Sequence, residues 1–93
     1  MDKRKAEQLA ETELESYRSL QYETIAAKLG TQECFERETE DGNKYSVEVD
    51  FFYDDAEERN IRVTAMISNS FWTSISPFSS DFIVAPDGSF IGE

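Results

Sequence analysis

The stretch Tyr45–Tyr53, YSVEVDFFY, decides the fold that this sequence predicts. Large apolar and polar side chains alternate along it, and a β-strand points alternate side chains to opposite faces. A second run, Ile61–Ile67 (IRVTAMI), has the same alternation. If the two runs form a hairpin with Tyr53 opposite Ile61, they present one continuous apolar face. The other face, which we call the outer face, is then mostly polar.

A further strand is expected just before this hairpin, at residues 32–39 (QECFERET), followed by an Asp-Gly turn. A two-residue loop and a three-residue loop give registers that differ by one position, which exchanges the two faces. We favour the three-residue loop because it buries Phe35 opposite Val47 and pairs opposite charges beside the turn. In this register Cys34 lies on the outer face, opposite Glu48.

Residues 4–29 are predicted to form one long helix that packs on the apolar face of the sheet. They contain neither glycine nor proline and are rich in strong helix formers. Apolar side chains recur mostly three and four residues apart, which gives an apolar stripe. At 1.5 Å per residue such a helix is about 39 Å long, so its first turns are expected to project beyond the sheet.

The C-terminal third is expected to continue the sheet. Residues 71–76 (FWTSIS) are the predicted fourth strand, 81–85 a short fifth strand, and 89–92 a brief return. The register of the fourth strand stays open. A three-residue turn before it places Trp72 on the outer face beside Met66, whereas a two-residue turn directs Trp72 into the core.

These elements predict a single α+β domain over residues 1–93, with one N-terminal helix on a four- to five-stranded antiparallel meander. The order of elements is similar to that of cystatin-like and related folds, which wrap a curved sheet around a leading helix. The Gln-x-Val-x-Gly loop of the inhibitor family is absent from the sequence. The resemblance therefore does not imply protease inhibition.

The formal net charge of −11 is concentrated in one part of the chain. Residues 1–29 carry −1, residues 30–60 carry −8, and residues 61–93 carry −2. A field of this sign repels phosphate backbones and anionic membrane surfaces, which argues against nucleic-acid and membrane partners. The one cysteine, Cys34, has no partner for an internal disulfide, and no apolar signal region opens the chain. A cytoplasmic location is therefore expected.

The composition argues against catalysis and against a bound cofactor. With no histidine, the commonest general base and metal ligand at neutral pH is missing. One cysteine and no histidine also exclude a zinc site. The acidic run 54–58 (DDAEE) has oxygen ligands for a weakly bound Ca²⁺ but lacks the spacing of an EF-hand, so a solvated loop is the favoured interpretation.

The sharpest functional expectation concerns the outer face, where four side chains form the candidate interface. Large apolar groups gathered on a solvent-facing surface usually mark a contact site. The sequence therefore predicts a non-catalytic binding or oligomerisation module, acting on a protein partner or as a homodimer. The alternative is an acidic inhibitor, an immunity-type protein or a nucleic-acid mimic, bound to a basic partner. The four candidate residues are Phe52, Arg62, Met66 and Trp72.

Overall fold

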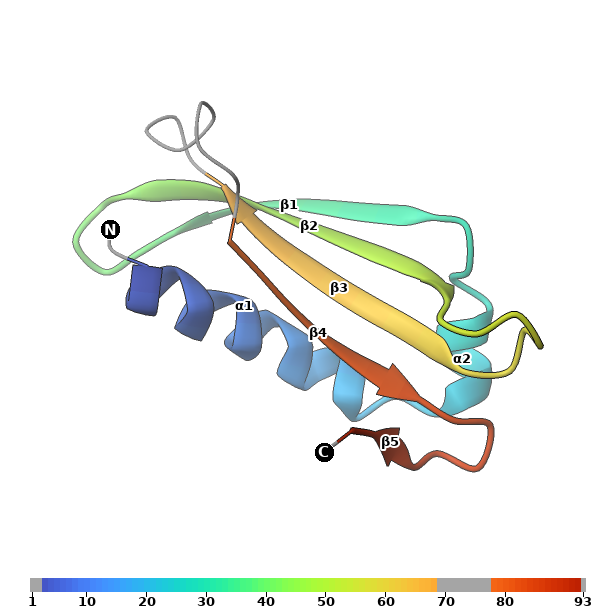
Figure 1. Cartoon of the computed structure of the whole chain (residues 1–93). Coiled ribbons are helices and arrows are strands. Elements are labelled where there is room, and N and C mark those ends of the chain that lie inside the picture. The colour runs from blue at the N-terminus through green and yellow to red at the C-terminus, as the bar shows by residue number, and fades with distance from the viewer. Residues whose placement is uncertain (1–2, 69–77, 93) are drawn as a thin grey trace.

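The computed structural model describes residues 3–68 and 78–92 of the chain. It contains a helix packed on a five-stranded antiparallel sheet, so the predicted α+β class is confirmed. The strands are ordered β1-β2-β3-β4-β5, and α1 lies beneath the sheet along β3 and β4 (Figure 1). The elements are α1 (Lys3–Arg18), α2 (Tyr22–Ala26), β1 (Gln32–Glu38), β2 (Lys44–Tyr53), β3 (Ile61–Ser68), β4 (Phe78–Val84) and β5 (Phe90–Ile91).

The central hairpin of β2 and β3 has the predicted register. Tyr53 faces Ile61, and Val49 faces Ala65. Burial alternates residue by residue along β3 and along β2 as far as Phe52, as the period-two pattern requires, whereas Tyr53 at the end of β2 is 38% exposed. The fully or nearly fully buried side chains of this hairpin are Tyr45, Val47, Val49, Phe51, Ile61, Val63, Ala65 and Ile67.

The β1–β2 hairpin also has the favoured register. Phe35 faces Val47, and Cys34 lies on the outer face opposite Glu48. The turn is a three-residue loop that ends in Gly42, whose φ of 88° lies in the left-handed region where glycine has no steric penalty. A one-residue slip is disfavoured because it would carry Phe35 to the outer face.

The single long helix predicted for residues 4–29 is wrong. Helix α1 ends at Arg18, and α2 begins at Tyr22 after Gln21 adopts an extended conformation with φ −72° and ψ 155°. The hydroxyl of Ser19 donates to the carbonyl three residues earlier at 2.8 Å, and such bonds compete with the helical backbone. Helix propensity alone does not reveal this competition.

The break between α1 and α2 lets both helices bury apolar side chains. It turns the chain so that Ile25 of α2 becomes fully buried, and the Tyr22 hydroxyl donates to the Arg59 carbonyl at 2.6 Å. The shorter α1 does not project as expected, because Ala6 and Ala10 are both fully buried.

The expected neighbour of β3 is also corrected. β3 pairs with β4, so that Val63 faces Phe82 and Ile61 faces Val84. Phe82 and Val84 are 3% and 2% exposed and continue the apolar face that β2 and β3 begin. This position in the sheet was assigned to residues 71–76, which lie outside the described residues, as does the question of where Trp72 points. The short return strand is present as β5, paired to the end of β4.

On the inner face of β1, the charged residues Glu33 and Arg37 flank Phe35, in contrast to the apolar inner face of β2. Glu33 accepts a hydrogen bond from the Tyr17 hydroxyl at 2.5 Å and forms an ion pair with Lys28 at 2.7 Å. These donors, Lys28 first, hold the pKa of Glu33 below that of an ordinary glutamate. Burial, reinforced by Glu33, raises the pKa of Tyr17. Four residues further along β1, Arg37 forms an ion pair with Glu13 of α1 at 2.9 Å.

Truncation of Leu14 tests how much α1 stabilises the sheet. Leu14 is fully buried, so we expect Leu14→Ala to lower the free energy of unfolding by about 2–5 kcal/mol, through lost transfer energy and a residual cavity. Urea denaturation followed by circular dichroism measures this loss. Its exposed neighbour provides the control, because Glu15→Ala is expected to change stability by about 0.5 kcal/mol or less. Equal effects of the two substitutions would contradict the packing of α1.

The polar contact beneath β1 predicts a pH dependence. Because the folded-state pKa of Glu33 is lowered, its stabilising contribution is present above the unfolded-state pKa and is lost as the pH falls through the folded-state value. The stability difference between the natural chain and Glu33→Gln should therefore be full at neutral pH and shrink below about pH 5. Urea titrations across this range measure it. Glu36→Gln, exposed on the same strand, is the control, and parallel pH profiles for Glu33→Gln and the natural chain would refute the assignment.

Candidate outer-face binding surface

Within the described residues, no helix lies over the outer face of the sheet, because α1 packs on the opposite side (Figure 1). Side chains that alternate with the buried ones therefore point into solvent or lie flat on the strands. The pairing of the strands arranges them in rows that run across the sheet. Two of these rows contain the three predicted interface residues that the structure describes, Phe52, Arg62 and Met66.

The first of these rows, which we call the apolar row, crosses four strands. Phe52 of β2 faces Arg62 of β3, Arg62 faces Ile83 of β4, and Ile83 faces Ile91 of β5. Phe52 is 45% exposed and Ile91 is 44% exposed, both high for large apolar side chains. The row therefore combines exposed apolar surface at its two ends with one cation between them.

Arg62 is held in place by a carboxylate from each neighbouring strand. Its guanidinium contacts Asp54, just after β2, at 2.7 Å and also binds Asp81 of β4. These two hydrogen-bonded partners raise the pKa of Arg62. Asp50, which lies diagonal to Arg62 across the hairpin, accepts a hydrogen bond from Gln32 at 2.9 Å. With both of its partners in place, the cation of the apolar row is neutralised by the protein itself.

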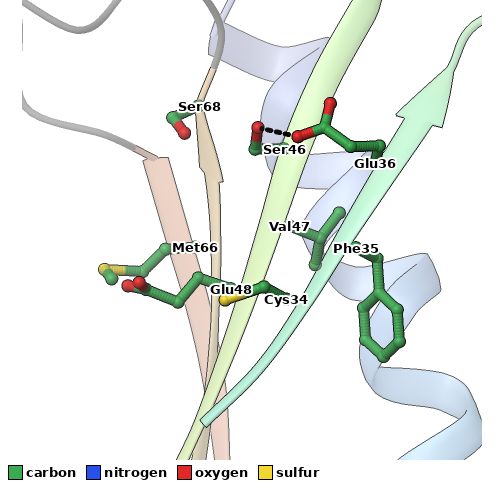
Figure 2. Close-up of a pocket in the computed structure, with 8 residues that line it drawn as sticks. All are labelled: Cys34, Phe35, Glu36, Ser46, Val47, Glu48, Met66 and Ser68. Carbon is green, nitrogen blue, oxygen red and sulfur yellow. Dashed lines mark hydrogen bonds between the residues drawn. The ribbon is translucent and has the colours of Figure 1, made fainter.

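Met66 lies in a different part of the outer face. Its row contains Cys34, Glu48 and Ser79. It is four residues from Arg62 on the same strand, so roughly 13 Å of strand separates it from the apolar row. Figure 2 shows the side chain of Met66 beside that of Glu48. Of the predicted residues that the structure describes, Phe52 and Arg62 therefore lie together and Met66 lies apart from them, while Trp72 is outside the described residues.

A hollow of about 360 Å³ lies on the outer face where the Met66 row crosses β1, β2 and β3 (Figure 2). It exists because several side chains here are short, while the carboxylates and the thioether around them are longer. At its rim, the Glu36 carboxylate accepts a hydrogen bond from the Ser46 hydroxyl at 3.0 Å. The lining residues are Cys34, Phe35, Glu36, Ser46, Val47, Glu48, Met66 and Ser68.

Two apolar residues of the outer face were not among the predicted interface residues. Ile83 and Ile91 join the apolar row because β4, rather than residues 71–76, pairs with β3. The alternation within DFIVA already separates Ile83 from Phe82 and Val84, so it indicated that Ile83 faces outward. What it did not indicate was the neighbouring strand.

The outer face is acidic as well as partly apolar. Its charged side chains on β1 to β4 are five carboxylates and two cations, a formal charge of −3. One of the cations, Arg62, is already paired with two carboxylates. The seven residues are Glu36, Glu38, Glu48, Asp50, Asp81, Lys44 and Arg62.

The acidic loop between β2 and β3 is organised by Asp55. Its carboxylate accepts the backbone N–H groups of Arg59 at 3.0 Å and Asn60 at 2.9 Å, and these bonds lower its pKa. Asp55, the second carboxylate of the acidic run, therefore stabilises the loop itself. Across residues 3–68 and 78–92, no group of three or more histidine, cysteine, aspartate or glutamate side chains is placed to hold a metal ion.

In the described part of the chain, neither helix is both long and apolar enough to cross a bilayer. Comparison with known proteins found no matching family model, no matching curated protein and no matching solved structure. The functional interpretation therefore depends on the geometry of the outer face.

The double ion pair of Arg62 generates a stability prediction. In Arg62→Gln, Asp54 and Asp81 lose their shared cation, and we expect the free energy of unfolding to fall by about 1 kcal/mol at low salt, since exposed pairs contribute little each. The difference should shrink in 1 M NaCl because salt screens exposed charges. Urea denaturation at both salt concentrations measures it. Arg59→Gln, exposed in the nearby loop, should be close to neutral, and an equal loss in both variants would contradict the proposed role of Arg62.

Proposed function

We propose that this protein is a non-catalytic binding module whose outer sheet face engages a basic protein. The observation that supports this most directly is the apolar row, which exposes a large apolar side chain at each of its two ends on a face that no described helix covers. An exposed row of this kind is costly to leave in water and is typical of contact surfaces.

The apolar contribution to binding comes mainly from the two ends of the row. Phe52 and Ile91 each leave close to half of their surface in solvent. Covering the remainder of each by a partner contributes about 1 kcal/mol per side chain. Arg62 adds no unpaired charge to the contact, because its carboxylate partners are supplied by the protein itself.

The charge of the face selects the partner. At −3, two copies of this face repel each other when they pack around a twofold axis, because an isologous contact places the same patch on both sides. The same sign opposes nucleic acid and anionic membranes. A protein surface carrying lysine or arginine is complementary to it.

An acidic inhibitor or nucleic-acid mimic is the second candidate. The observation that favours it is the charge of −8 on residues 30–60, which form β1, β2 and the loops around them. The two candidates differ in the interaction that dominates. Binding through charge weakens steeply with added salt, whereas binding through the apolar row persists in 1 M NaCl.

The remaining parts of the proposal are supported by composition and exposure. The absence of histidine from the sequence favours a binding role over a catalytic one. The exposed free thiol of Cys34 suits a reducing compartment such as the cytoplasm. The order of elements resembles cystatin-like folds, but we infer no inhibitory activity from it, because the inhibitor loop motif is missing.

Site-specific photo-cross-linking tests the proposed surface. A benzophenone amino acid at position 52 should form an adduct with a basic protein, identified by mass spectrometry. The same group at Thr12, exposed on α1, should form no such adduct. Ile91→Asp should reduce the adduct at position 52 by on the order of tenfold, because it places a charge in the apolar contact.

The outcomes separate the candidates. An adduct that persists in 1 M NaCl supports the apolar contact, and one that disappears with salt supports the acidic inhibitor. An adduct of twice the chain mass would show self-association through this face and refute the basic partner. Equal labelling from positions 52 and 12 would refute the outer face as the binding surface.

A further inference from the structure

We propose that the free edge of β1 receives an extended basic segment of the partner as an added strand. This inference rests on the proposed function for the charge of the partner, but it concerns a different surface. Strand addition to an open sheet edge is a common mode of peptide recognition, in which backbone hydrogen bonds supply affinity and alternate side chains supply specificity.

The backbone of β1 is available for such pairing. Among the strands of the described residues, β1 is the outermost, and its seven residues pair there with β2 on one side only. The Thr39 N–H donates to the Asn43 carbonyl at 2.9 Å, which sets the phase of the ladder. Because bonding alternates along an antiparallel pair, odd-numbered residues of β1 bond to β2. The backbone groups of Gln32, Cys34, Glu36 and Glu38 therefore point to the free edge.

Within residues 3–68 and 78–92, no turn, loop or cap hydrogen bond involves the backbone of these four residues. β1 has no proline, and its pairing with β2 is continuous without a bulge. Exposed edges are usually protected by such devices or by charge, and here charge is the protection that β1 has. The opposite edge strand, β5, has only two residues and offers much less backbone.

The charge of β1 favours a basic strand over a second copy of β1. The residues whose backbone faces the edge also point their side chains to the outer face, where Glu36 and Glu38 lie. Antiparallel pairing of two β1 strands would bring like charges together, which is unfavourable. An incoming strand with lysine or arginine at alternate positions would instead meet these carboxylates beside the hollow.

The other side of the added strand should be apolar. On the inner face, the edge of β1 presents Phe35, which is half-buried beneath the Arg37 guanidinium at 4.9 Å. An apolar residue of the incoming strand would extend this contact. The geometry therefore specifies a segment in which basic and apolar residues alternate.

The test uses the full chain labelled with ¹⁵N and the peptide acetyl-KVKVKVK-amide. The free peptide concentration is set to about ten times the dissociation constant. Exchange of the edge amides then requires the unbound form, so it should slow by about tenfold. The amides concerned are those of Gln32, Cys34, Glu36 and Glu38. A peptide of the same composition in block order and a peptide N-methylated at every second residue are the controls. Both should bind much more weakly, since they lack the alternation or the backbone donors.

Two protein variants separate backbone pairing from charge. Cys34→Pro removes one edge-facing donor that the β2 ladder does not use, so the fold should remain and peptide binding should weaken on the order of tenfold. The double variant Glu36→Lys, Glu38→Lys keeps every edge donor and should abolish binding by charge. Circular dichroism verifies folding, and the double variant keeps the test decisive if Cys34→Pro does not fold.

The results distinguish this inference from the proposed function. Protection of the four edge amides would support it. The inference would be overturned, and outer-face binding left intact, if the peptide shifted the amide resonances of Phe52, Ile83 and Ile91 while the edge amides still exchanged freely. Failure of the peptide to bind at all would also overturn it, whereas the outer face is judged separately by the cross-link at position 52.

Discussion

The structure depends on the packing of one face of the β2–β3 hairpin against α1. Strict alternation in both strands gives each a buried side and an open side, and pairing aligns the two buried sides. Leu14 of α1 and Val63 of β3 belong to the same core and are both fully buried. Because α1 covers only this side, no helix of the described residues lies over the outer face.

Local patterns predicted the elements whose partners are close in sequence. Both hairpin registers followed from alternation and turn length, since a slip would move Phe35 or Val49 to the wrong face. The helix break was not predictable in this way, because every residue near Ser19 tolerates a helix. It results from hydroxyl bonds to the backbone and from the tertiary contacts of Tyr22 and Ile25.

The candidate site was predicted in part for the same reason. Phe52 and Arg62 share a hairpin, so their adjacency followed from its register. Ile83 joined them only once β4 was known to lie beside β3, a pairing across residues 69–77 that sequence alternation does not specify. Residues 71–76 had been predicted as the next strand, and β-propensity does not indicate which strand becomes the neighbour.

The distribution of charge connects the open face with the open edge. Most of the acid lies on residues 30–60, and β1 and β2 form the end of the sheet whose edge is free. An edge without proline or a bulge can pair with the same edge of another copy of the chain. Carboxylates on β1 and β2 make this pairing unfavourable because they repel each other. The same carboxylates lower the free energy of contact with lysine and arginine. In the strand addition that we propose, the charge that disfavours pairing between copies of the chain therefore also favours a basic incoming strand.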